Sequence, residues 1–236
     1  MVHLPAKTQL YDTTKVLYDR LTALQERLLV DSGGRILVAL AGVPGFGKSM
    51  IATALAEISR QQEDKNLAIL PMDGFHFPKS TLCNFDRPDD AFRYRGAPFT
   101  FDVQAFVRLV KALKLSPVTF SDEPELAIQA PSFNHAVQDP IDEDIYISSA
   151  DKVVILEGNY LLLDEAPWKD IASLVHERWF VEVSDSIAKQ RLIDRHLRAG
   201  IETTRDAAEV RAESNDMRNA HLIRKRLVSP DVVIHN

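Results

Sequence analysis

Apolar residues fall into two kinds of spacing along this 236-residue chain. Five short apolar runs, at 36–40, 67–70, 153–156, 179–183 and 232–234, show no alternation with polar residues. Runs of this kind are typical of strands that are covered on both faces. The pattern therefore predicts five short buried strands.

Between these runs, apolar residues recur at spacings of three, four and seven. The spacing predicts an N-terminal helix over 10–30 and further helices over 49–60, 102–115, 168–175, 186–197 and 207–227. Asp102 stands where an N-cap belongs. We expect the first helix to pack on its own domain, although a dimer seam remains an alternative.

Strands that alternate with helices indicate an α/β domain whose parallel sheet has helices on both faces. We expect a single domain over 1–236, with an N-terminal helix in 1–34 and a core in 35–236. Residues 116–150 are rich in proline and acid and lack a helical period. They predict a hairpin-like insertion that serves as a substrate-binding or lid-like region, because long irregular insertions are more often functional than idle.

The composition of the chain excludes several kinds of partner and location. Charged residues make up 26% of the chain and the formal net charge is −6, so nucleic acid is not an expected partner. Cys83 is the only cysteine, which excludes an intrachain disulfide and favours a cytoplasmic location. The apolar run 153–163 is too short to span a bilayer and contains Glu157, so no membrane association is expected.

A glycine-rich loop follows the first strand. It matches the pattern G-x-x-x-x-G-K-[ST] and consists of Gly42, Val43, Pro44, Gly45, Phe46, Gly47, Lys48 and Ser49. Its backbone N–H groups and the following helix N-terminus suit a phosphate, while Lys48 would reach the β- and γ-phosphates and Ser49 would ligate Mg²⁺. Only the Phe46 backbone is needed, so its side chain can point outward. A plain glycine turn is the alternative.

Two carboxylates follow other strands. Asp73, in MDGFH, would lie in the crevice beyond the strand ends, where it can accept the proton of an attacking alcohol. It is an equal alternative that Asp73 only forms a turn with Gly74 and has no catalytic role. Glu157 ends the third strand and is the candidate for holding Mg²⁺ with Ser49. The alternative is that Glu157 only marks the point where that strand meets solvent.

Three arginines share one helical face, at Arg191, Arg195 and Arg198. This row could fold over a nucleotide and stabilise charge on the transferring phosphoryl group. A solvated face paired with Asp194 or Glu202 is the alternative.

Together these motifs resemble the phosphoribulokinase/uridine kinase family of P-loop kinases, which includes the bacterial-type pantothenate kinases. The resemblance runs from about residue 35 to the C-terminus. It is carried in order by GVPGFGKS, MDGFH, RGAPFTFD, PSFNH, VVILEGNYLLL, APW, RLIDRH and the segment from Asn215-Asp216 to Asn219. Within the family it is most similar to fructose-transport-type and nucleoside or sugar kinases.

The resemblance implies a P-loop NTPase fold with a five-stranded parallel sheet and the phosphate-loop strand in its centre. It implies ATP and Mg²⁺ as cofactors and a small metabolite (sugar, nucleoside or vitamin alcohol) as phosphate acceptor. Lys48, Asp73 as base and Arg195 as lid arginine would be catalytic, Glu157 would join Ser49 at the metal, and Met50 and Arg191 would join the nucleotide site. The implied acceptor residues are Asp73, Phe75, His76, Arg95, Phe133, His135, Asn159 and Asn219.

Several alternatives stay open. Uridine-specific members carry a tyrosine-aspartate pair near Phe133-Asn134, which this chain lacks. A P-loop ATPase, or a regulatory protein that binds ATP without an acceptor, is the alternative to a kinase. The acceptor, homo-oligomerisation and the part played by Arg87, Arg93 and Arg95 in holding an anion are also undecided by sequence.

Overall fold

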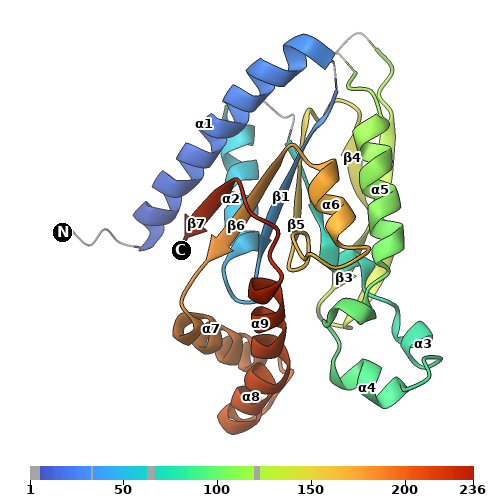
Figure 1. Ribbon diagram of the computed structural model, residues 1–236, viewed down its shortest axis with the longest axis vertical. Helices are drawn as coiled ribbons and strands as arrows, with labels where there is room; N and C mark the ends of the chain where they lie inside the picture. The colour runs from blue at the N-terminus through green and yellow to red at the C-terminus, as the bar shows by residue number, and fades with distance from the viewer. Residues whose placement is uncertain (1–5, 33, 63–66, 120–122) are drawn as a thin grey trace.

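The computed structural model describes residues 6–32, 34–62, 67–119 and 123–236. Its main sheet is parallel, in the order β2-β5-β1-β6-β7. The strands are β1 (Ile36–Gly42), β2 (Leu67–Pro71), β5 (Val153–Gly158), β6 (Glu177–Glu182) and β7 (Val232–His235). This confirms the predicted five-stranded parallel sheet with the phosphate-loop strand in its centre (Figure 1).

The register of the sheet brings the predicted site residues to one edge. Leu40 of β1 and Pro71 of β2 both lie beside Glu157 of β5. Because the strands are parallel, the segments that follow them leave the sheet at the same carboxyl edge. Asp73 and Asn159 each come two residues after this level, and the phosphate loop starts from the same edge.

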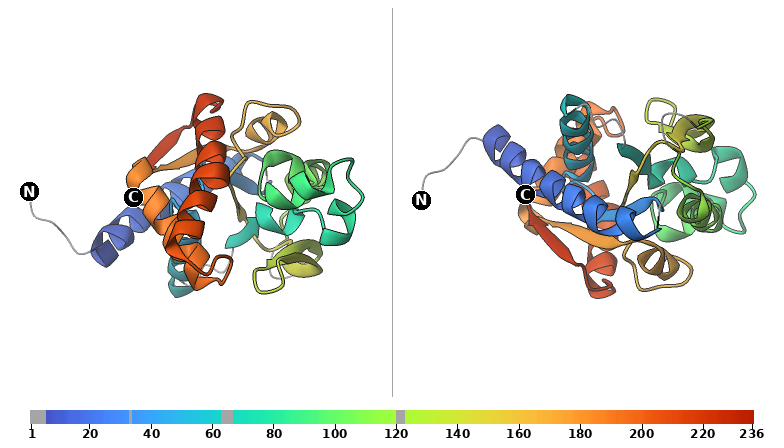
Figure 2. Two further views of the ribbon diagram at one scale, coloured as in Figure 1. Left: turned by 90° about the horizontal axis from the view of Figure 1, so that it is seen from below. Right: turned by 90° about the horizontal axis from the view of Figure 1, so that it is seen from above.

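Helices cover both faces of the sheet. Helix α2 (Lys48–Gln61) packs on one face and α6 (Lys169–Leu174) on the other, as the views along the vertical axis show (Figure 2). Helix α1 (Ala6–Ser32) buries Leu17, Leu21 and Leu24 against this core. The expectation that the first helix packs on its own domain is therefore confirmed.

The other predicted helices are present, with one exception. Helices α5 (Val103–Leu115) and α7 (Asp185–Arg198) agree with it, and the Asp102 carboxylate caps α5 by accepting a 2.8 Å hydrogen bond from the Ala105 N–H. The helix predicted over 207–227 is interrupted. It comprises α8 (Arg205–Arg211), the π-helical turn η3 (Ala212–Met217) and α9 (Arg218–Lys225).

The predicted insertion contains an antiparallel hairpin, β3 (Ala127–Asn134) paired with β4 (Asp139–Ser148). It docks on the turn η1 (Met72–Phe75) that follows β2. A Cβ atom on Gly74 would lie 2.0 Å from the carbonyl oxygen of Pro131, so only glycine permits this approach. Gly74 therefore couples the hairpin to the segment that carries Asp73.

The segment after η1 forms an arm that the sequence pattern did not predict. It contains α3 (Lys79–Leu82), α4 (Pro88–Arg93) and the 3₁₀ turn η2 (Pro98–Thr100). Figure 1 shows this arm and the helices α7 to α9 on opposite sides below the sheet. Within the part of the chain that the structure describes, no helix has the length and apolar character to cross a membrane.

Candidate active site

The phosphate loop is closed by glycines in left-handed conformations. Gly45 has φ 82° and Gly47, at the N-cap of α2, has φ 87°. A Cβ atom on Gly45 would also make a tight contact, at 3.1 Å from the carbonyl oxygen of Ala188, so the conformation requires glycine and the close packing favours it. The loop therefore turns directly into the N-terminus of α2, which is a favourable position for an anion.

Of two apolar side chains at the phosphate loop, Phe46 is buried and Met50 is exposed. The Phe46 side chain is fully buried, with the Arg224 guanidinium carbon 5.1 Å from its ring centroid. The expectation that Phe46 points outward is therefore wrong, because the ring anchors the loop in the core. Met50 is exposed on the first turn of α2.

Lys48 is buried at the start of α2. Its ammonium donates hydrogen bonds to Asn159 Oδ1 at 2.7 Å and to the Val43 carbonyl oxygen at 3.1 Å. Burial lowers the pKa of Lys48, while the nearby Glu157 and Asp73 carboxylates oppose this shift. A polyphosphate in the loop would add negative charge beside the ammonium and stabilise its protonated form.

The Ser49 and Glu157 side chains are joined by a hydrogen bond. Burial raises the pKa of Glu157, while Lys48 and a hydrogen bond with Ser49 act in the other direction. Carboxylate and hydroxyl oxygens are ligands that suit Mg²⁺, whose remaining ligands at phosphate loops are phosphate oxygens and water. Among the described residues, no group of three or more histidines, cysteines and acids could hold a metal on its own. The pair thus fits a metal ion that arrives with a nucleotide.

A cavity of about 470 Å³ joins the phosphate loop to the predicted acceptor residues. Pro44 and Ser49 line it on the loop side, and Asp73 lies half-buried in its wall. The structure brings ten of the predicted site residues to this cavity: Pro44, Ser49, Asp73, His76, Arg95, Phe133, His135, Asn159, Arg195 and Asn219. The cavity therefore holds a carboxylate and a phosphate loop together, as phosphoryl transfer to an alcohol requires.

His76 is held in an aromatic stack. Its ring lies 3.9 Å from the Phe101 ring and 4.6 Å from the Phe133 ring, measured between centroids. Its Nδ1 contacts the Asp73 carbonyl oxygen at 2.8 Å, which places the proton of the neutral ring on Nδ1. Burial lowers the pKa of His76. A neutral imidazole therefore positions the segment that carries Asp73.

The three arginines of α7 do not act as one row. Arg195 lines the cavity, with Nη2 at 3.8 Å from an Asp216 carboxylate oxygen. Arg191 lies at the phosphate loop, where Nη1 donates to the Gly45 carbonyl oxygen at 3.4 Å. Arg198 is exposed and does not line the cavity. The alternative pairing of this row with Asp194 or Glu202 is not observed among the described residues, because Asp194 pairs with Arg205 at 3.9 Å and Glu202 with Arg211 at 3.7 Å.

The π-helical turn supplies site residues that were not among the predicted ones. Asn215 and Asp216 line the cavity, and the Asp216 carboxylate contacts Nε2 of the buried His196 at 2.8 Å. The Asn215 amide donates to the Arg95 carbonyl oxygen at 3.1 Å. Both residues lie in the last motif of the resemblance, which is the one signal that could have identified them.

One predicted acceptor residue lies elsewhere. Phe75 does not line the cavity, and its buried ring packs edge-on against Phe106, with the centroids 4.9 Å apart. Its side chain belongs to the core between η1 and α5, whereas the neighbouring Gly74 and His76 face the hairpin and the cavity. Phe75 thus supports the site without lining it.

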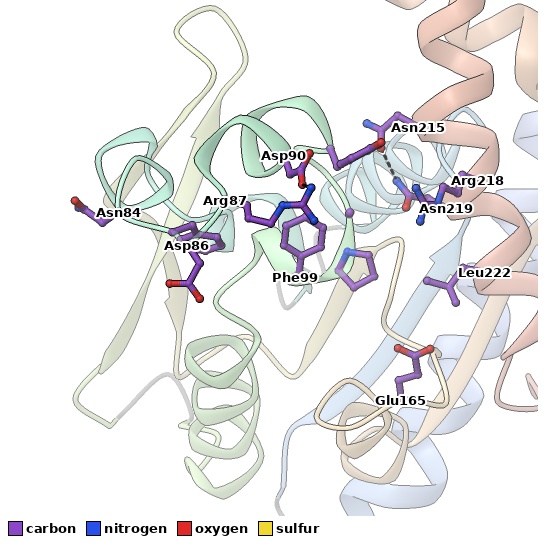
Figure 3. A pocket seen from close by; sticks show the side chains of 14 residues that line it. Asn84, Asp86, Arg87, Asp90, Phe99, Glu165, Asn215, Arg218, Asn219 and Leu222 are labelled. Atoms are coloured by element: carbon purple, nitrogen blue, oxygen red, sulfur yellow. Dashed lines mark hydrogen bonds and ion pairs between the residues drawn. The ribbon is translucent and has the colours of Figure 1, made fainter.

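A second cavity, of about 920 Å³, lies between the arm and α9 (Figure 3). Asn215 and Asn219 line both cavities and are linked by a 3.4 Å hydrogen bond, drawn as a dashed line in Figure 3. The larger cavity contains neither the phosphate loop nor Asp73. The chemistry therefore belongs to the smaller one.

The chain is similar in sequence to two fungal proteins. A candidate uridine kinase of Schizosaccharomyces pombe is 38% identical over 201 residues, which cover 85% of this chain and 83% of that protein. An ATP-dependent kinase-like protein of Aspergillus versicolor is 42% identical over 171 residues, which cover 70% of this chain and 94% of that protein. No family profile matches the chain.

The fold also matches a solved structure. A candidate fructose transport system kinase from Silicibacter superposes with a TM-score of 0.77 at 33% identity, covering 92% of this chain and 98% of that one. The likeness therefore extends over nearly the whole of both chains.

Proposed function

The chain belongs to the uridine kinase-like family of P-loop kinases, and from this premise we propose that it transfers the γ-phosphoryl group of ATP to a hydroxyl group of a small metabolite, with Mg²⁺ as metal cofactor. The observation that carries the proposal is the half-buried carboxylate of Asp73 in the cavity that the phosphate loop also lines. A hydrolase acting on ATP alone needs no such place for an alcohol.

The phosphates of ATP bind to the backbone N–H groups of the loop and to Lys48. Asn159 and the Val43 carbonyl oxygen already hold the ammonium at the loop, so little reorganisation is needed. Ser49 and Glu157 would hold Mg²⁺, which would neutralise charge on the phosphate oxygens. The γ-phosphoryl group would then be next to the cavity that Pro44 and Ser49 line.

Transfer then requires a deprotonated alcohol. The acceptor oxygen forms the new bond to phosphorus, the bond to the bridging oxygen of ADP breaks, and the hydroxyl proton passes to Asp73. Arg195 lies in the same cavity and stabilises the charge that spreads over the transferring group. The remaining atoms of the acceptor face His76, Arg95, Phe133 and Asn219.

Two features disfavour uridine as the acceptor. The tyrosine-aspartate pair of uridine-specific members is replaced by Phe133-Asn134. In addition, the Asn134 side chain is engaged within its own turn, where Oδ1 accepts from the Ala136 N–H at 2.9 Å. The uridine kinase name of the fungal relative is therefore not carried over to this chain.

An acceptor screen tests the proposal. Purified protein with MgATP is assayed for ADP against sugars, sugar phosphates, nucleosides, hydroxy acids and vitamin alcohols such as pantothenate, with a blank that lacks acceptor. The kinase proposal expects ADP formation that depends on one acceptor class. Phosphate release at the same rate in the blank would instead identify an ATPase, and tight ATP binding without turnover would identify an ATP-binding regulatory protein.

A further inference from the structure

The structure distinguishes three neighbouring arginines of the arm. The Arg87 side chain is 81% exposed and paired with Asp90 (Figure 3). Arg93 is exposed, and its guanidinium carbon lies 5.4 Å from the centroid of the Tyr94 ring. The Arg95 side chain, in contrast, is only 9% exposed and lines the catalytic cavity. Among these three cations, Arg95 alone is buried where an acceptor would bind.

The hydrogen bonds of Arg95 are incomplete. Its Nη2 donates to the Phe77 carbonyl oxygen at 3.0 Å and to Asp139 Oδ1 at 3.2 Å. Its Nε and Nη1 are buried, and neither has a hydrogen-bond partner among the described residues. Arginine stays charged at any pH that a protein tolerates, so these donors cannot be neutralised by loss of a proton. Buried donors without partners carry a desolvation cost that a bound acceptor would remove.

The neighbouring charges do not supply the missing partner. Asp139 is shared, because one of its oxygens also accepts from the Lys79 N–H at 2.9 Å. The other arginines of the cavity have their own acids: Arg195 lies 3.8 Å from Asp216, and Arg211 lies 3.7 Å from Glu202. His76 is neutral, since burial lowers its pKa and the Arg95 charge acts in the same direction. The positive charge of Arg95 is therefore only partly compensated.

Arg95 is also linked to the segment that carries the proposed base. Its Nη2 bonds to the carbonyl oxygen of Phe77, which lies four residues after Asp73. Between them, the His76 ring contacts the Asp73 carbonyl oxygen. The Arg95 and Asp73 side chains both line the cavity of about 470 Å³, which is where the acceptor is proposed to bind.

We propose that the phosphate acceptor carries an anionic group, a carboxylate or a phosphate, which binds to the unpaired N–H groups of Arg95 while the acceptor hydroxyl faces Asp73. This inference rests on the proposed kinase function and narrows its acceptor to hydroxy acids and phosphorylated sugars or alcohols. A neutral nucleoside or free sugar leaves the Arg95 donors unpaired. A site built to pair a polar group discriminates strongly against analogues that lack it.

Matched pairs of acceptors test the inference. Each anion is compared with its neutral counterpart in the ADP assay: glycerate with glycerol, gluconate with glucitol, pantothenate with panthenol, and fructose 6-phosphate with fructose. We expect the anion of the active pair to have a kcat/KM at least about 100-fold higher than its neutral counterpart. The carboxylate and phosphate pairs decide between the two sources of charge. Equal turnover of a neutral counterpart would overturn the anionic acceptor while leaving the kinase function intact.

Variants test whether Arg95 causes the preference for anionic acceptors. Arg95→Gln should abolish the preference for the anion, and Arg95→Lys should keep it with a raised KM, because one charge remains without the planar donors. Arg93→Gln is the matched control on the same arm and should retain wild-type discrimination. A preference that survives unchanged in Arg95→Gln would contradict the assignment.

A binding measurement keeps the inference testable even if no acceptor turns over. The Tm is measured with a saturating nonhydrolysable ATP analogue and Mg²⁺, which occupy the phosphate loop, and then with added glycolate or inorganic phosphate. At ten times its Kd, the bound anion should raise the Tm of the wild type and of Arg93→Gln by about 3–5 °C. The analogue itself should stabilise Arg95→Gln, which shows that the variant is folded, but the anions should not. Equal anion shifts in all three proteins, or none in the wild type, would overturn the proposal.

Discussion

The ammonium of Lys48 donates a 2.7 Å hydrogen bond to the Oδ1 atom of Asn159. The two residues belong to different strand ends, since Lys48 follows β1 and Asn159 follows β5. Their contact fixes the lysine of the phosphate loop at the edge of the sheet where Asp73 also lies. Because the ammonium is buried, this bond matters more than an exposed one would.

Removing the Asn159 amide should therefore destabilise the protein. We expect Asn159→Ala to lower the free energy of unfolding by about 1.5–3 kcal/mol, because a buried cation loses one of two acceptors. Urea denaturation without nucleotide measures this change. The control is Asn84→Ala, at an exposed amide on the arm, which should leave the midpoint nearly unchanged. An unchanged midpoint for Asn159→Ala would contradict a structural role for the bond.

Removing the ammonium itself should act on catalysis. Lys48→Ala should lower kcat/KM by about 10²–10³-fold or more, because one preorganised charge beside the transferring group is lost. Steady-state ADP formation measures the change. Lys111→Ala, at an exposed lysine of α5, is the matched control and should behave as the wild type. Activity of Lys48→Ala close to that of its control would exclude this lysine from the transfer step.

The buried His76 should make stability depend on pH. Burial lowers its folded-state pKa below the unfolded value of about 6.5, so on acidification the unfolded chain binds a proton before the folded chain does. Linkage then requires the free energy of unfolding to decrease as the pH falls below about 6.5, and to regain its full value above it. Urea midpoints at several pH values should show a shallower decrease for His76→Asn than for the wild type. His221→Asn, at an exposed histidine, should keep the wild-type slope, and equal slopes in all three proteins would refute the prediction.

Gly74 should control the docking of the hairpin. In Gly74→Ala the new methyl group meets the Pro131 carbonyl oxygen, and we expect a cost of about 1–3 kcal/mol in stability. Faster hydrogen exchange in β3 and β4 would locate the disturbance. Gly200→Ala is the comparison, because Gly200 has open space around its Cβ position. Its φ of 64° makes alanine cost about 1–2 kcal/mol in stability, but hydrogen exchange in β3 and β4 should stay unchanged. Unchanged exchange in the hairpin of Gly74→Ala would show that the close approach is not needed.

The sheet and the phosphate loop were predictable because their signals are local. Strand β1 is a continuous apolar run, completely buried, and it leads directly into the loop motif. The capping role of Asp102 was also predictable, since an N-cap depends on the residues beside it. Such features need no knowledge of distant parts of the chain.

The features of the site that the sequence did not predict depend on contacts between distant segments of the chain. Arg87, Arg93 and Arg95 look alike in sequence, and only the packing of Arg95 against Phe77 and Asp139 makes it different. The π-helical turn that presents Asn215 and Asp216 is an insertion of one residue into a helical pattern, which periodicity does not reveal. Phe75 and His76 are adjacent, yet the fold sends one side chain to the core and the other to the cavity.

The most direct test of the central claim is acceptor-dependent ADP formation by Asp73→Asn. Amide and carboxylate have nearly the same size, so the variant should bind MgATP as tightly as the wild type does. It should lose about 10²–10⁴-fold in kcat, because the amide cannot accept the hydroxyl proton. Asp142→Asn, at an exposed carboxylate of β4, should keep wild-type activity. Wild-type turnover in Asp73→Asn would contradict the role of this carboxylate as the base.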